Sequence, residues 1–176
     1  MTRQISLRIS TILTALAVTV LLATTVTFVT LWALARSELH DRDVRAADDR
    51  HAEQVAMDYA VGSSTIDYRD PKAWLTRLQA NTTKELAAKF AATAPQLEQV
   101  ITPLQWTSTA KPIRAVVASE SGGVYRVDAF LDVASTSSQA PQGGRNTVAY
   151  DITVDRNQDW KITSVGGGLQ GPLAGK

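Results

Sequence analysis

The sequence has 176 residues, 44% of them hydrophobic and 20% charged, and its 18 basic and 17 acidic side chains leave a formal net charge of +1. So balanced a charge offers no basic surface for DNA or RNA, which disfavours nucleic-acid binding. The absence of cysteine excludes a disulfide framework, a thiolate metal site and a cysteine nucleophile. The length leaves one domain of ordinary size after the N-terminal segment, and that domain must rest on packing.

The first predicted element is a transmembrane helix over residues 9–35. This stretch has no charged residue and lies between Arg8 and Arg36. At about 1.5 Å per helical residue it reaches roughly 40 Å, more than a hydrocarbon core of about 30 Å. Trp32 suits the outer interface, and the short basic tail over residues 1–8 suits the inner one. The pattern predicts a single-pass protein of the cell membrane, with a cytoplasmic N-terminus and an extracytoplasmic C-terminal domain.

Two features leave alternatives open for this segment. Arg36, Arg42 and Arg45 lie beyond its outer end, so basic residues alone do not fix the orientation. Residues 33–35 read Ala-Leu-Ala, which matches a signal-peptidase site, and cleavage there would release a secreted domain. The apolar run is about twice as long as the usual apolar core of a signal peptide, which has 7 to 15 residues, and this length favours an uncleaved anchor.

Helices are predicted for the first part of the chain beyond the anchor. Residues 37–60 lack Gly and Pro and read as a juxtamembrane helix, either a solvated stalk or a helix that packs on partner subunits. Asp70-Pro71 is the favoured order for a helix start, an N-cap acid followed by proline. Thr82-Thr83 opens a further helix. Pro95 is expected to open a separate short turn that stops at Pro103.

After Pro103 the apolar periodicity changes to two, which is typical of strands. A first strand runs towards the Gly122-Gly123 turn, and residues 125–133 and 147–155 alternate apolar and polar side chains. Helices followed by about four antiparallel strands predict an α+β fold, a cone-like roll of helices packed on a curved sheet. The predicted order is a cytoplasmic tail, transmembrane helix, juxtamembrane helix, roll domain and flexible tail, over residues 1–8, 9–35, 36–60, 61–168 and 169–176.

A set of short stretches, spread over nearly the whole chain, carries a resemblance. Besides the anchor, they are Asp67-Tyr68-Arg69 before Trp74-Leu75, Thr82-Thr83 with Leu86 and Phe90, and Trp160-Lys161-Ile162-Thr163 with Val165. Through them the sequence resembles the Mce-associated membrane proteins of actinobacteria. The resemblance implies a nuclear-transport-factor-2-like roll on a membrane anchor. It also implies a non-enzymatic accessory subunit, without catalytic residues or cofactors, that stabilises or assembles an Mce-type lipid and sterol import complex.

The anchored topology also resembles the inner-membrane scaffold subunits of type IV secretion (conjugation) systems, which share the roll. Both resemblances imply membrane-protein partners in an envelope complex, with lipid contact as a secondary property. A different class of function, a roll-fold enzyme of the ketosteroid isomerase type, would need an acid or base in the cavity of the roll.

The sequence offers little chemistry for such an enzyme. His40 and His51, eleven residues apart on one predicted helix, stand roughly 16 Å apart, too far to bind one metal ion. Asp67 and Tyr68 could pair a carboxylate with a phenol, but no second acid or base lies at a defined spacing. We therefore predict no catalytic residue, no metal ligand and no cofactor.

The remaining candidates concern contacts. Interfaces usually centre on aromatic and arginine anchors, which selects Arg69, Arg77, Phe130 and Arg145. A pocket, where the roll encloses one, is expected between a helical wall and one face of the sheet. Its candidate lining residues are Trp74, Leu78 and Phe90 on the helices and Val127, Val148, Tyr150 and Ile152 on the sheet.

Overall fold

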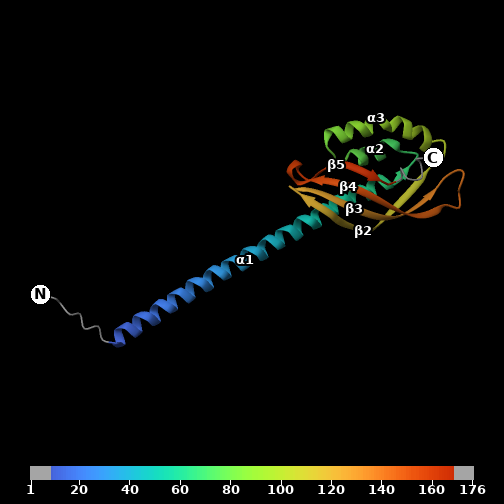
Figure 1. The fold of residues 1–176 in the computed structure, drawn as a ribbon. Coiled ribbons are helices and arrows are strands. Elements are labelled where there is room, and N and C mark those ends of the chain that lie inside the picture. The colour runs from blue at the N-terminus through green and yellow to red at the C-terminus, as the bar shows by residue number, and fades with distance from the viewer. Residues whose placement is uncertain (1–8, 169–176) are drawn as a thin grey trace. The chain divides into compact units, whose positions relative to one another are not determined.

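The structure is a computed structural model that describes residues 9–168, with only part of the side chains before residue 42. The chain divides into two units, residues 1–47 and 48–176, and the second is the roll. The elements follow in the order α1 (Ile9–Ser64), β1 (Ile66–Asp67), α2 (Pro71–Gln79), α3 (Lys84–Ile101), β2 (Thr107–Ser121), β3 (Val124–Thr136), β4 (Gly144–Asp155), the 3-10 turn η1 (Arg156–Gln158) and β5 (Lys161–Gly167) (Figure 1).

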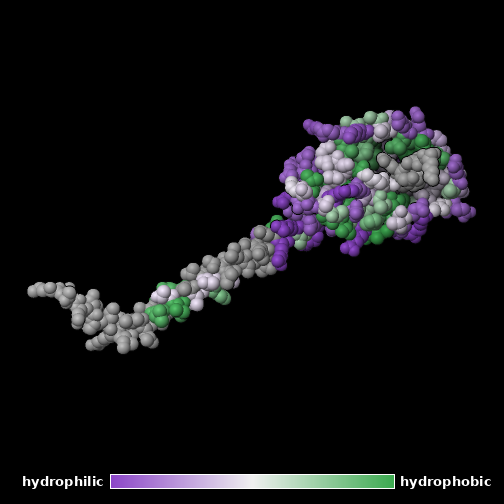
Figure 2. All heavy atoms as spheres, viewed as in Figure 1, coloured by the Kyte–Doolittle hydropathy of each residue, from purple (hydrophilic) through white to green (hydrophobic). Residues whose placement is uncertain are grey.

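One continuous helix, α1, takes the place of the two helices predicted over 9–35 and 36–60. Large apolar side chains in its N-terminal part are exposed, Leu21 by 68% and Phe28 by 71%. Figure 2 shows hydrophobic surface, in green, on this part of the chain. As far as side chains are described, none of the helices combines the length and apolar character that crossing a membrane requires. Many side chains of the predicted span, and both predicted tails, lie outside the described residues.

The two shorter helices begin where the sequence places their caps. The Asp70 carboxylate accepts a hydrogen bond from the backbone N–H of Ala73 at 3.0 Å, and Thr83 caps α3 in the same way. The prediction that Pro95 opens a separate turn is wrong, because α3 continues through it to Ile101. A proline inside a helix removes one backbone donor, and the packing of α3 on the roll outweighs that loss.

The sheet has five antiparallel strands in the order β1-β2-β3-β4-β5 and curls around the helices. The α+β roll predicted from the sequence is therefore confirmed, with one strand more than the four expected. The predicted hairpin at Gly122-Gly123 is also present, with φ of +61° and +85° at the two glycines. Asn157 donates from its side-chain amide to the carbonyl of Gly122 at 2.8 Å, which holds this hairpin to the turn before β5.

The extra strand, β1, covers only the beginning of β2. It pairs through Ile66 with Ser108 and through Asp67 with Thr107, and among the described residues no other strand flanks that edge of β2. Two register shifts interrupt the pairing of β2 with β3 further along, after Pro112 and after Val117. At the second shift the backbone N–H of Val117 donates to the Glu53 carboxylate of α1 at 3.1 Å.

The core lies between the last turns of α1 and the inner face of the sheet. Val127, Leu131 and Ile152 are completely buried, and β3 and β4 place Val127 opposite Ile152 in register. α1 contributes small side chains at helical spacing, the alanines Ala52, Ala56 and Ala60, all with no exposed surface. The small side chains of the helix leave room for the large aliphatic side chains of the sheet, and together they form a fully buried core.

Candidate functional site

A cavity of about 610 Å³ lies on the other side of the roll, between the face of α3 and strands β4 and β5. Figure 1 shows α2 and α3 over this part of the sheet. Its aromatic lining comes from all parts of the roll: Tyr59, Trp74, Phe90, Trp106 and Tyr150. The remaining wall is mostly aliphatic, which is the composition expected of a site for an apolar ligand.

The predicted pocket residues divide into two groups. Trp74, Leu78, Phe90 and Tyr150 line the cavity. The other three, Val127, Val148 and Ile152, do not line it and are buried in the filled part of the core. All of them share the inner face of the sheet, so periodicity alone does not separate the two groups.

Buried polar side chains form hydrogen bonds with the last residues of α1. The hydroxyls of Tyr150 and Ser64 share a buried hydrogen bond of 2.7 Å, and Ser108 donates to the Ser64 carbonyl at 2.7 Å. The Trp74 indole donates to the Ser63 carbonyl at 2.8 Å. The bonds from Ser108 and Trp74 satisfy carbonyl groups that the last helical turn leaves without partners.

The phenol of Tyr59 in the cavity wall favours its neutral form. Burial raises the pKa of Tyr59 far above the usual range of a phenol, and the nearby Tyr150 adds to the shift. Asp67 and Tyr68, the pair weighed for catalysis, are not part of the wall. Among the described residues no group of three His, Asp or Glu side chains lies close enough to hold a metal ion.

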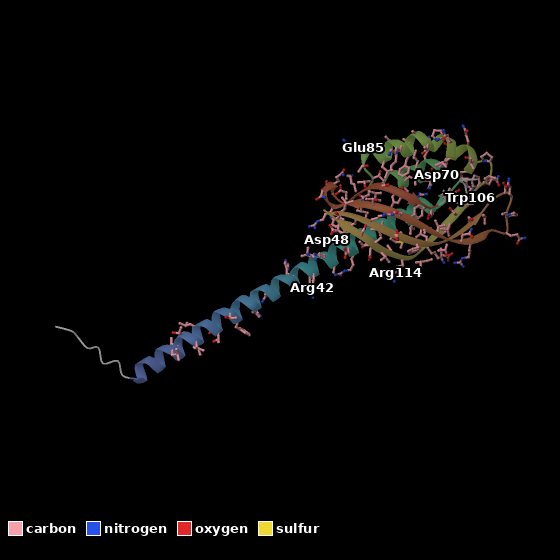
Figure 3. The ribbon with its side chains drawn as sticks, viewed as in Figure 1. Arg42, Asp48, Asp70, Glu85, Trp106 and Arg114 are labelled. Atoms are coloured by element: carbon pink, nitrogen blue, oxygen red, sulfur yellow. The ribbon has the colours of Figure 1, made fainter. Side chains whose placement is uncertain are left out.

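Trp106 shows a feature that sequence reasoning missed. Its indole Nε1 is buried and has no hydrogen-bond partner among the described residues. The residue follows Gln105, which has a φ of +49°, and this left-handed turn carries the chain from α3 into β2. Figure 3 labels Trp106 close to the helices, whereas Arg114 of β2 lies on the opposite side of the sheet.

The four candidate interface residues occupy unlike surroundings. The Arg77 guanidinium donates to the Gly62 and Thr65 carbonyls at 3.3 and 2.9 Å, so this residue closes the end of α1. Arg69 stacks over the neighbouring Tyr68 ring and is otherwise exposed. The other two candidates, Phe130 and Arg145, belong to the sheet.

The outer face of the sheet is charged, with one aromatic residue among the charges. Asp128, Phe130 and Asp132 alternate along β3 and so point to the same side. Arg126 pairs with Asp151 at 2.6 Å on this face, and Arg145 pairs with Asp132. The 37% exposed Phe130 ring therefore stands among ion pairs, an arrangement typical of interface centres.

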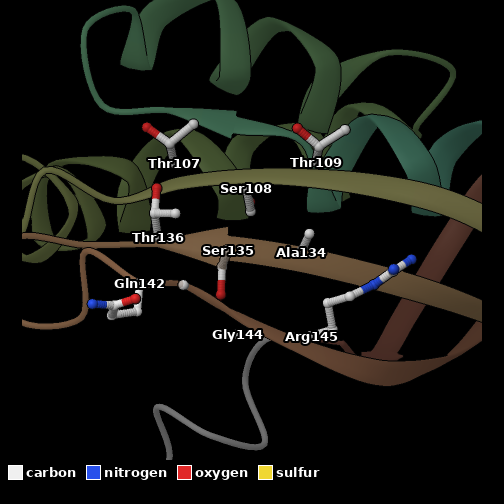
Figure 4. Close-up of a pocket in the computed structure, with 10 residues that line it drawn as sticks. Thr107, Ser108, Thr109, Ala134, Ser135, Thr136, Gln142, Gly144 and Arg145 are labelled. Atoms are coloured by element: carbon white, nitrogen blue, oxygen red, sulfur yellow. The ribbon is translucent and has the colours of Figure 1, made fainter.

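A second hollow, of about 430 Å³, lies where β2, β3 and β4 meet the Gly143-Gly144 turn. Hydroxyl side chains such as Thr107 and Ser135 dominate it, and Figure 4 shows Gln142 and Arg145 beside them. Arg145 is the charged residue among those that line this hollow, and its guanidinium forms an ion pair with Asp132. The positive charge of Arg145 is therefore already neutralised by a protein carboxylate.

Comparisons with known proteins bear on the fold. No family model and no curated protein sequence matches the chain. The periplasmic domain of DotI aligns with 65% of the chain and 91% of its own length, at 14% identity and a TM-score of 0.53. An IcmL-like type IV secretion system protein from Legionella pneumophila aligns with 67% of the chain and 90% of its own, at 10% identity and a TM-score of 0.54.

At such identities the likeness establishes the fold alone. The chain shares its α+β roll with the periplasmic domain of DotI and with the IcmL-like protein. The resemblance to Mce-associated proteins is not confirmed by these structures, and the resemblance to type IV secretion scaffolds agrees with them at the level of the fold.

Proposed function

We propose that this chain is a non-enzymatic scaffold subunit of a multiprotein complex in the cell envelope, of the type IV secretion type. The observation that carries the proposal is the outer face of the sheet, where the exposed Phe130 ring lies between Asp128 and Asp132. An aromatic anchor inside a polar rim is the usual centre of a protein interface. The roll fold shared with the IcmL-like secretion protein supports the same assignment.

The proposal includes attachment to the cell membrane through residues 9–35, with the N-terminus in the cytoplasm and the roll outside. The exposed apolar side chains of this part of α1 support it, since Leu21, Phe28 and Trp32 need cover from lipid or from apolar partner helices. Protease added to spheroplasts should cleave the roll without lysis. Cleavage only after lysis would place the roll in the cytoplasm and refute this orientation.

A second candidate is an accessory subunit of an Mce-type lipid and sterol importer. The observation that favours it is the apolar cavity of about 610 Å³, because a scaffold that only joins proteins has no need of one. The residues that carry the resemblance, such as Trp74, Leu86 and Phe90, include several that line this cavity.

The test is purification of the full-length protein from its native membranes in a gentle detergent, followed by mass spectrometry of the proteins that accompany it. Recovery of secretion-channel subunits supports the proposal. Recovery of importer permease and substrate-binding subunits replaces it with the second candidate. Recovery of the protein without any partner contradicts both.

A substitution on the outer face makes this test specific. Phe130→Ala should lower partner recovery while leaving the melting temperature of the full-length protein close to that of the wild type. Val124→Ala, which truncates an exposed apolar side chain at the start of β3, six residues from Phe130, is the control and should leave recovery unchanged. Equal recovery with both variants would remove Phe130 from the interface.

A further inference from the structure

The cavity has the shape of a slot along α3. The residues of α3 that line it recur at spacings of three and four, so one face of the helix borders it over its whole length. They are Leu86, Lys89, Phe90, Thr93, Leu97 and Ile101, together with Val100. From Leu86 to Ile101 the helix rises by about 22 Å at 1.5 Å per residue. A space that follows the helix over this length can hold an extended chain.

The walls of the slot are apolar at depth. Trp74, Leu78 and Ile101 are each only 6% exposed although they line the cavity, so they border it from inside the roll. On β5 the cavity is lined by the half-buried Thr163 and the exposed Ser164. An occupant would therefore bury its apolar body against the helices and keep its polar end near solvent.

The charged side chain that lines the slot indicates which headgroup an occupant should carry. Lys89 is the one charged side chain among the described residues that line the cavity, and it lies exposed in the second turn of α3. No described acidic side chain forms an ion pair with it. A single ammonium at one end of an apolar slot is complementary to an acidic headgroup.

We propose that this slot binds one single-chain amphiphile of the long-chain fatty-acid class, with its chain along α3 and its carboxylate at Lys89. The inference goes beyond the proposed scaffold function and does not depend on it, because the outer face of the sheet and the slot are different surfaces. The scaffold function and the slot can therefore be refuted separately, each by its own experiment.

The experiment is equilibrium binding of radiolabelled oleate to the full-length protein held in a fatty-acid-free amphipathic polymer. We expect saturation at one oleate per chain. Leu97→Trp places an indole in the slot and should weaken oleate binding by at least about tenfold. Gln96→Trp adds the same group to an exposed position of α3 that does not line the slot and should bind as the wild type does.

A second variant guards against misfolding of the first. Thr93→Trp enters the slot from an exposed position, so it should fold and still block oleate. Absence of saturable oleate binding to the wild type, or full binding by both slot variants, would overturn the proposal.

The headgroup assignment has its own pair of variants. Lys89→Gln should weaken oleate binding by about two- to fivefold, the range of exposed ion pairs, and leave methyl oleate unaffected. Lys84→Gln, at the exposed start of the same helix, is the control for the loss of one positive charge. Methyl oleate that binds the wild type as tightly as oleate does would overturn the acidic headgroup.

Discussion

The two sides of the roll differ in how completely the side chains of a helix and of the sheet fill the space between them. Where α1 meets β3 and β4, alanines on the helix face large aliphatic side chains on the sheet, and residues such as Ala56 and Leu131 have no exposed surface. Where α3 faces β4 and β5, the helix carries large side chains, including Phe90 and Leu97, and a cavity of about 610 Å³ stays open.

The difference teaches that large apolar side chains do not by themselves fill the space between a helix and a sheet. A helix with small residues can approach a sheet until the side chains of the sheet fill the space, whereas long side chains hold the axis away. In this roll the filled side provides stability, and the open side keeps room for another molecule.

The largest expected effect comes from emptying the filled side. Leu131→Ala should lower the free energy of unfolding by about 2–5 kcal/mol, because it leaves a void among side chains that cannot collapse into it. Phe130→Ala on the outer face is the control and should cost far less. Urea unfolding of the full-length protein measures both, and equal losses would mean that the two faces of β3 are not distinct.

Adding volume sharpens the comparison. Ala56→Leu should lower the free energy of unfolding by about 1–3 kcal/mol, since the filled side has no room for three more carbon atoms. Leu97→Trp adds a larger group on the open side and should change stability by less than about 1 kcal/mol. The same urea series decides, and a larger loss for Leu97→Trp would contradict the division into a filled and an open side.

The hydrogen bond between Tyr150 and Ser64 joins the two sides. Tyr150→Phe should lower the free energy of unfolding by about 1 kcal/mol, because it leaves the buried Ser64 hydroxyl without this partner. Tyr68→Phe, which removes a hydroxyl bonded to the exposed Arg69, should be close to neutral. A neutral Tyr150→Phe would show that solvent in the open side replaces the lost bond.

The smallest expected effect depends on pH. Donors from the Gln158 side chain and from Asn157 hold the pKa of Asp155 below its ordinary value of about 3.9. The ionised carboxylate therefore stabilises the fold above that value, and the contribution is lost as the pH falls through the lowered pKa. Asp155→Asn should lower the melting temperature at pH 7 and match the wild type near pH 2. A difference that is the same at both pH values would exclude this linkage.

Local chemistry made much of the fold predictable. The Asp70 cap, the Gly122-Gly123 hairpin and the alternation along β3 and β4 are each specified by neighbouring residues. β1 was not predictable, because two residues form a strand only where β2 offers them partners. The course of α3 through Pro95 depends on tertiary packing in the same way.

The site was only partly predictable for a related reason. Val127 and Tyr150 share the inner face of the sheet, and only the curl of the sheet and the bulk of the facing helix decide which of them borders a cavity. No periodic pattern in the sequence encodes that choice.

The residues that carry the resemblance also show why the sequence did not distinguish an Mce-type importer from a type IV secretion system. Thr83 donates from its backbone N–H to the Ile162 carbonyl at 2.9 Å, and Ile162 donates to the Asn81 carbonyl at 2.8 Å. Trp160 accepts a hydrogen bond from the Asn81 side chain at 3.1 Å. These residues join the helices to β5, so they are characteristic of the roll and do not distinguish between the two resemblances.

The long edge of β2 has a consequence for assembly. An uncovered strand invites a second copy to extend the sheet, which is how soluble proteins polymerise in an uncontrolled way. Here Pro112 offers no donor, two register shifts disturb the flat outline that an incoming strand would need, and Glu53 already occupies the N–H of Val117. These features disfavour extension of the sheet by a second copy along this edge.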